Sequence, residues 1–189
     1  LTCGDVGSGK PIVGVITVYI SYLSNYQSAL LAPTEILAKQ HYENITKLFS
    51  GTNLKTALLL GSTKKKEKES ILRDLSSGKI DLLIGTHAML NEKVNFKNLG
   101  LVITDEQHRF GVNQRESLRN KGLLPDILYM SATPIPRTYA LTIYGDMDIS
   151  LIKTKQSGRK EIKTIIKYEK EIKNVLYLML EELKKNHQI

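Results

Sequence analysis

The chain has 189 residues, a formal net charge of +8 at pH 7, 41% hydrophobic residues and 24% charged residues. Such a chain buries one good core and part of a second domain, and it has no apolar run of membrane-spanning length. The single cysteine, Cys3, excludes an internal disulfide and a multi-cysteine metal site, and it fits a reducing cytoplasm. The positive charge favours a polyanionic partner. The alternative is that the lysines only keep the surface solvated, and the net charge alone does not distinguish the two.

The first motif along the chain is a glycine-rich loop that ends in a lysine. Residues 4–10 read GDVGSGK, which fits the phosphate-binding pattern G-x-x-x-x-G-K. Glycines let backbone N–H groups curl around a phosphate at a helix N-terminus, and the lysine reaches the outer phosphates. The loop predicts a nucleotide site formed by Gly4, Gly7, Ser8, Gly9, Lys10 and Pro11.

Pro11 departs from this pattern, which has serine or threonine at that position. Proline lacks the hydroxyl that would ligate Mg²⁺ and the backbone N–H that would point at a phosphate. It also biases Lys10 away from the α-helical region, where the loop enters its helix. We therefore expect weak or metal-insensitive nucleotide binding.

Beyond this loop, short apolar segments alternate with amphipathic ones. The apolar segments predict strands at 28–32, 55–60, 80–84, 99–104, 127–131 and 149–153. The amphipathic segments predict helices at 11–23, 34–49, 64–76, 113–121 and 136–144. Strands that are apolar throughout are typical of parallel sheets covered on both faces. The alternation predicts an α/β fold, with a doubly wound, mainly parallel sheet and helices on both faces.

Ligands on such sheets bind where the carboxyl ends of strands meet the following loops. Pro33 and Thr34 lie in one such loop, and Thr86 and His87 lie in another. Their backbone N–H groups and hydroxyls could bind the phosphates of a nucleic acid. Taken alone each loop is weak evidence, because Thr34 is equally suited to capping its helix.

An acidic pair, Asp105-Glu106, follows the strand at 99–104 and precedes His108. An acid at a strand end can hold Mg²⁺ through water, and its neighbour can activate an attacking water. We predict the metal role for Asp105, the base role for Glu106 and a role in coupling to neighbouring loops for His108. A solvated acidic turn and a structural histidine are the simpler interpretations. The position of the pair, about three strand–helix units after the phosphate loop, favours the catalytic one.

A third motif, SATPIPRT at 131–138, leaves the strand at 127–131. The small hydroxyl residues Ser131 and Thr133 could hydrogen-bond the acidic motif and report on the γ-phosphate. A capped helix start would also account for the two prolines of this stretch.

The composition changes after residue 153. Residues 154–160 are polar and predict a linker, and a strand at 161–167 and a helix at 169–185 are expected to follow it. The predicted helix carries one apolar stripe, formed by Ile172, Val175, Leu176, Met179 and Leu183. We interpret 1–153 as one domain and 161–189 as the start of a second, truncated one. A chain that begins almost on its phosphate loop, without methionine, is expected to be a fragment.

Together these motifs resemble the first RecA-like motor domain of superfamily 2 DNA helicases. Within that group they are most similar to the RecG family, ATP-dependent helicases that remodel stalled replication forks. The matching text, in order, is GDVGSGK at 4–10, APTEILA at 32–38 with Gln40 and His41, GTHAML at 85–90, DEQHRFGVNQ at 105–114 and SATPIPRT at 131–138. Transcription-repair coupling factor shares the last stretch, but its acidic motif usually reads differently, so the text at 105–114 favours RecG.

The resemblance implies a P-loop NTPase that uses ATP and Mg²⁺ and acts on branched or single-stranded DNA. It implies a phosphate grip by Gly7, Gly9 and Lys10, and the Mg²⁺ and water-activating roles for Asp105 and Glu106. It implies that Ser131 and Thr133 couple ATP to DNA. The loop residues that face nucleic acid in such helicases correspond to Pro33, Thr34, Gly61, Ser62, Thr86 and His87.

The resemblance also implies partners within the same protein, namely a second motor domain and an upstream domain that splits DNA junctions, and no membrane. Without the arginine finger of a second motor domain, we expect the 189 residues alone to have little ATPase activity and no unwinding activity. One alternative is a nucleic-acid-binding module with a degenerate ATP site, which Pro11 and the +8 charge support. A P-loop kinase of small molecules is a third possibility, which the motifs at 105–108 and 131–138 argue against.

Overall fold

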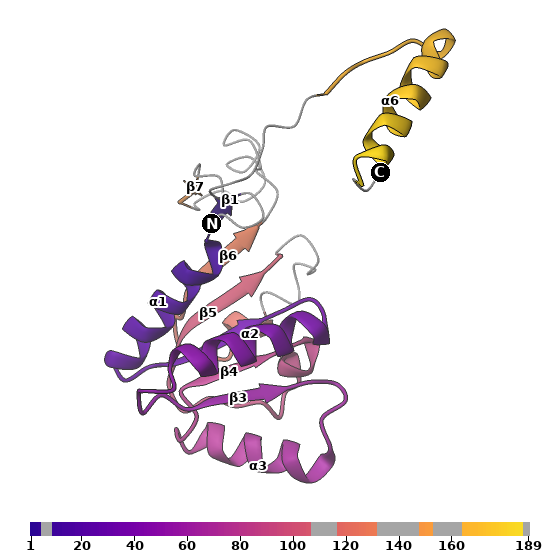
Figure 1. The fold of residues 1–189 in the computed structure, drawn as a ribbon. Helices are drawn as coiled ribbons and strands as arrows, with labels where there is room; N and C mark the ends of the chain where they lie inside the picture. Colours follow the sequence, from indigo (N-terminus) through magenta and orange to yellow (C-terminus); the bar gives the residue numbers. More distant parts are fainter. Residues whose placement is uncertain (5–8, 107–116, 132–147, 153–163, 187–189) are drawn as a thin grey trace. The chain divides into compact units, whose positions relative to one another are not determined.

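The computed structural model describes residues 1–4, 9–106, 117–131, 148–152 and 164–186 (Figure 1). The chain divides into two compact units, residues 1–156 and 157–189. In the part of the chain that the structure describes, no helix is both long and apolar enough to cross a membrane.

The first unit is built around a seven-stranded sheet whose strand pairs are all parallel. Its strands are β1 Thr2–Gly4, β2 Gln27–Leu31, β3 Thr56–Leu59, β4 Leu82–Gly85, β5 Leu99–Asp105, β6 Asp126–Ser131 and β7 Ser150–Ile152. Their order across the sheet is β3-β4-β2-β5-β6-β1-β7. Parallel neighbours need crossover connections, and the amphipathic helices between the strands provide them. The predicted α/β fold with a parallel sheet is confirmed.

Helices cover both faces of this sheet. They are α1 Lys10–Leu23, α2 Glu35–Leu48 and α3 Lys65–Ser76, together with a 3₁₀ helix, η1, at His87–Leu90. Val18 of α1 and Ile45 of α2 pack with Leu30 on one face. Leu75 of α3 packs with Leu31 on the other face. Successive residues of β2 thus serve opposite cores, as the two-residue period of a strand requires.

Most predicted elements of the first unit are confirmed. Six predicted strands and three predicted helices agree with the observed ones to within two residues at each end. Of the helix predicted at 113–121, residues 117–119 are helical, and the helix predicted at 136–144 lies outside the described residues. Two elements were not predicted. Three residues of β1 are too few to show a period, and they form a strand because they pair with β6 and β7; η1 was expected to be a loop.

In the second unit, the predicted helix is confirmed and the predicted strand is wrong. The helical segment comprises η3 Glu169–Glu171 and α6 Ile172–Lys184. Residues 164–167, the described part of the predicted strand, form no regular structure. A strand needs a hydrogen-bonded neighbour to be stable, and no described strand pairs with this segment. The predicted apolar stripe of α6 is 39–57% exposed.

Candidate functional site

The carboxyl ends of six neighbouring strands lie along one edge of the parallel sheet (Figure 1). In sheet order these loops or strand ends carry Gly61 and Ser62, Thr86 and His87, Pro33 and Thr34, Asp105 and Glu106, Ser131, and finally Gly9 and Lys10. The residues predicted to face nucleic acid therefore follow β3, β4 and β2. The residues predicted to bind ATP and its metal lie after β1 and at the end of β5, and Ser131, predicted to couple ATP to DNA, ends β6 between them. The strand order therefore separates the two sets along one edge.

The end of the phosphate loop is held in place by Lys10 and Gly9. Gly9 is the N-cap of α1 with φ of 87°, a left-handed conformation that glycine adopts without strain. The ammonium of Lys10 donates a hydrogen bond to the Gly4 carbonyl at 2.7 Å, and the Lys10 side chain is only 8% exposed. The lysine thus bridges the two ends of the loop at the positive end of the α1 dipole. This is the setting in which a helix N-terminus binds an anion.

Pro11 does not disturb the start of α1. We expected it to bias Lys10 away from the helical region, but α1 begins at Lys10 and continues through Pro11. Proline is tolerated in the first turn, where backbone N–H groups have no intrahelical acceptor to lose. The expectation for Lys10 is wrong because the packing of α1 against the core outweighs the steric bias that proline imposes on the preceding residue. The loss of a hydroxyl and of an N–H toward a phosphate remains a prediction.

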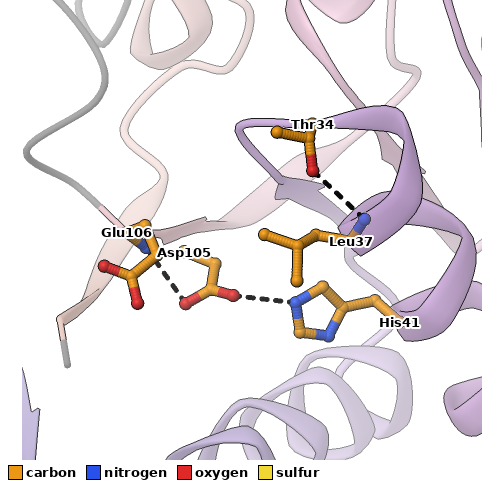
Figure 2. A network of polar contacts seen from close by, with 5 residues as sticks. All are labelled: Thr34, Leu37, His41, Asp105 and Glu106. Carbon is orange, nitrogen blue, oxygen red and sulfur yellow. Dashed lines mark hydrogen bonds and ion pairs between the residues drawn. The ribbon is translucent and has the colours of Figure 1, made fainter.

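The Asp105 carboxylate is fixed by hydrogen bonds at both oxygens (Figure 2). Oδ2 lies 2.8 Å from Nε2 of His41, a residue of α2, and Oδ1 accepts from the Glu106 backbone N–H at 3.0 Å. The side chains of His41 and Asp105 are 14% and 16% exposed. Because a carboxylate only accepts hydrogen bonds, His41 must carry its proton on Nε2 in this contact.

Glu106 has a backbone conformation that few residues other than glycine adopt. Its φ is 51°, and such a left-handed residue costs of order 1–3 kcal/mol of strain. Its backbone N–H donates to the carboxylate of the preceding Asp105. Figure 2 shows the Glu106 carboxylate on the side of Asp105 that faces away from His41.

The acidic pair and the phosphate loop follow β5 and β1, which are both neighbours of β6. Two strand spacings separate them, about 10 Å at the backbone, a gap that a triphosphate and its cation can span. The described residues hold no cluster of three or more His, Cys, Asp or Glu side chains that could form a metal cage. One or two carboxylates beside a phosphate site fit Mg²⁺, which keeps several waters and binds substrate phosphates.

The opposite half of the edge contains a second polar network. Thr34 caps α2 by accepting from the Leu37 N–H at 3.3 Å, as its sequence position predicted. Glu35 accepts from the backbone N–H and the hydroxyl of Ser62, at 3.1 and 2.8 Å. The Ser62 hydroxyl is the main cause that lowers the pKa of the Glu35 carboxyl below its ordinary value. The loops after β2 and β3 are thereby joined at the start of α2.

The side chains predicted to face nucleic acid differ in exposure. Thr34, Gly61, Ser62 and His87 are exposed and Pro33 is half-buried. Thr86 is only 2% exposed, and among the described residues its hydroxyl has no hydrogen-bond partner. Its side chain therefore lies beneath the surface that the other residues form.

Four predicted site residues, Gly7, Ser8, His108 and Thr133, lie outside the described residues. Ser131 ends β6 opposite Cys3 of β1 and is 2% exposed. Sequence analysis missed the roles of His41 and Glu35. Both belong to a matched stretch, so the resemblance marked their positions, but neither contact partner could be identified from it.

A parallel sheet that carries a phosphate loop after β1 and an acidic pair after β5 belongs to the RecA-like class of motor domains. Residues 1–142 match the DEAD/DEAH box helicase family, and the chain belongs to this family. Its members are NTPases that use ATP.

Individual relatives narrow the comparison. The chain is 54% identical over 185 residues to the ATP-dependent DNA helicase RecG of Staphylococcus epidermidis and 50% identical over 185 residues to that of Bacillus subtilis. Each match covers 98% of this chain but only 27% of the relative. A solved structure of RecG bound to a three-way DNA junction has a TM-score of 0.77 and 45% identity, over 97% of this chain and 25% of that one. The predicted resemblance to RecG is confirmed, and it is favoured over transcription-repair coupling factor.

Proposed function

We propose that the chain is the ATP-binding motor domain of a helicase that remodels branched DNA, such as replication forks and Holliday junctions, in recombination and repair. The observation that carries this proposal is the placement of Lys10 after β1 and of the Asp105–Glu106 pair at the end of β5, the two strands that flank β6. The identity to RecG helicases supports it. A cytoplasmic location follows from the same function.

The division of the chain belongs to the proposal as well. Residues 1–153 are the motor domain, 154–160 are a linker and 161–189 begin a second domain. The separation into units at residues 156 and 157 supports this division.

Each polar group of the ATP half has a role in this function. Backbone N–H groups at Gly9 and Lys10 and the Lys10 ammonium bind the outer phosphates. Asp105 would hold Mg²⁺ through water, and Glu106 would orient the attacking water and take its proton. Bound Mg²⁺ would supply neutralisation of the charge that develops on the phosphates. Ser131, at the end of the strand between the two halves of the ATP site, relays the state of the γ-phosphate.

The DNA half of the edge offers backbone N–H groups and hydroxyls near the N-terminus of α2. Thr34, Ser62 and His87 are exposed there, and phosphates of single-stranded or branched DNA are the ligands that such groups bind. Affinity for DNA should fall steeply with salt, because counterion release dominates binding to a phosphate backbone.

Nucleotide titration of the chain and of its Pro11→Thr variant tests the ATP site. We expect weak binding of MgATP by the chain, and a gain of about ten- to a hundredfold in the variant, because one charge-assisted hydrogen bond contributes about 1.5–3 kcal/mol. Lys10→Ala in the Pro11→Thr background is the negative control and should abolish the gain. A micromolar dissociation constant for the unaltered chain would contradict the expected effect of Pro11. A failure of both chains to bind nucleotide would refute the ATP site itself.

A second candidate function is a nucleic-acid-binding module that no longer uses ATP. Pro11 favours it, because proline offers neither the hydroxyl nor the N–H that the loop needs. DNA binding that is unaffected by nucleotide in both the chain and the Pro11→Thr variant would support this candidate over the motor.

A further inference from the structure

One helix, α2, touches both halves of the carboxyl edge. Its first turn carries Thr34 and Glu35, which hold the loops after β2 and β3. His41 lies two turns further along, about 10 Å at the helical rise of 1.5 Å per residue, and contacts Asp105. Figure 2 shows Leu37 on the same side of the helix, between the cap and the histidine.

Buried side chains along α2 pack the helix against the sheet. Ala38 is fully buried and Ile45 is 3% exposed, and both belong to the core between α2 and the sheet. Since side chains in a close-packed core permit discrete shifts rather than gradual deformation, a displacement of the first turn displaces His41 as well.

His41 provides one of the two hydrogen bonds that fix the Asp105 carboxylate. The other comes from the adjoining Glu106 N–H, which belongs to the same turn as Asp105. Among the described residues, His41 is therefore the side chain through which another element, α2, contacts the Asp105 carboxylate. Hydrogen bonds of this kind orient metal-binding carboxylates, and their loss typically reduces metal affinity about 10–100-fold.

We propose that His41 is a positioning residue that couples DNA bound at the loops after β2 and β3 to the metal-holding carboxylate of Asp105. The coupling runs through α2 and is separate from the stretch that begins at Ser131. This inference rests on the proposed function, since it needs nucleotide and DNA to bind at the two halves of the edge. His41 itself touches neither ligand and acts through Asp105.

The test measures binding, and therefore does not depend on turnover. A fluorescent ADP is titrated with Mg²⁺ or with excess chelator, and with or without oligothymidylate, on the chain and on its Pro11→Thr variant. His41→Ala is compared with His41→Gln, whose amide can still donate to Asp105. Asn44→Ala is the matched control, because Asn44 is an exposed residue of the same helix.

We expect His41→Ala to lower the affinity for MgADP about tenfold and to leave the metal-free affinity and the DNA affinity unchanged. We also expect it to abolish the effect of oligothymidylate on MgADP affinity, a coupling that must be reciprocal in the unaltered chain. His41→Gln should retain part of both effects, and Asn44→Ala should retain both in full.

Equal losses of metal-free and metal-dependent binding would indicate a merely structural role for His41 and would overturn the proposal. Unchanged metal dependence and unchanged coupling in His41→Ala would overturn it too, while leaving the proposed function standing. If neither reference chain binds nucleotide, the proposed function and this inference both fail.

Discussion

Replacing Gln27 by methionine is expected to destabilise the first unit by about 2–4 kcal/mol. Gln27 begins β2 and is 5% exposed. Its amide nitrogen donates to the carbonyls of Leu75 and Ile80 at 2.9 and 2.6 Å, and its amide oxygen accepts from the Asn98 N–H at 2.9 Å. One side chain thereby joins the end of α3 to the segments that lead into β4 and β5.

The magnitude follows from the groups that methionine would leave without a partner. The Leu75 carbonyl would still accept from the Gly78 N–H at 3.1 Å. Only the Ile80 carbonyl and the Asn98 N–H would therefore be left without a hydrogen-bond partner. Each unsatisfied buried group costs about 1–3 kcal/mol. Asn98 is exposed as a residue, so water can satisfy part of its loss, which places the sum in the lower part of the range. Methionine is close to glutamine in length, so a cavity adds little.

Urea unfolding followed by circular dichroism measures the effect as a lower midpoint at an unchanged slope. Gln40→Met is the matched control, because Gln40 is exposed on α2, and it should change the free energy of unfolding by less than about 0.5 kcal/mol. If Gln27→Met were no more destabilising than this control, the three hydrogen bonds would not contribute as argued.

Three further predictions concern single positions. At Gly14 a Cβ would meet its nearest neighbour at 3.5 Å, an ordinary contact, so Gly14→Ala should raise the free energy of unfolding by about 0.5–1 kcal/mol through helix propensity; a lower melting temperature would contradict this. At Gly85 a Cβ would lie 2.1 Å from the Leu59 carbonyl, so Gly85→Ala should separate β3 from β4 and cost about 3 kcal/mol, and an unchanged urea midpoint would exclude such a clash. The folded-state pKa of Glu35 is lowered by Ser62, so this contact stabilises the fold at neutral pH. That contribution should be lost as pH falls below the unfolded value of about 4.3. An NMR titration of Glu35 with an ordinary pKa in the chain, or with an equally lowered pKa in Ser62→Ala, which loses the hydroxyl and keeps the backbone N–H, would contradict the assignment.

Local pattern in the sequence was enough to predict most of the first unit. Apolar runs identify β2 to β7 and amphipathic periods identify α1, α2 and α3, because the periods of strand and helix are properties of neighbouring residues. The general rule that parallel strands end at one edge then brings Gly9, Lys10, Asp105 and Glu106 to the same side of the sheet. The motifs themselves were sufficient for the resemblance to RecG, which the identity to its relatives confirms.

Pattern failed where an element depends on a partner distant in the chain. Residues 2–4 form β1 because β6 and β7 lie on either side, and residues 164–168 form no strand despite their composition. Lys10 shows the same limit. Pro11 biases Lys10 locally against the helical conformation, but the packing of α1 against the core outweighs this bias.

Only the tertiary structure shows which contacts join the loops along the carboxyl edge. The strand order β3-β4-β2-β5-β6-β1-β7 separates the loops that we propose to face DNA from those that we propose to bind ATP. The contact between His41 and Asp105 joins residues 64 positions apart, and that between Glu35 and Ser62 joins residues 27 apart. The sequence determines which residues are polar at each strand end. Their pairing depends on how α2 lies across the sheet, and that is set by the packing of side chains from many segments at once.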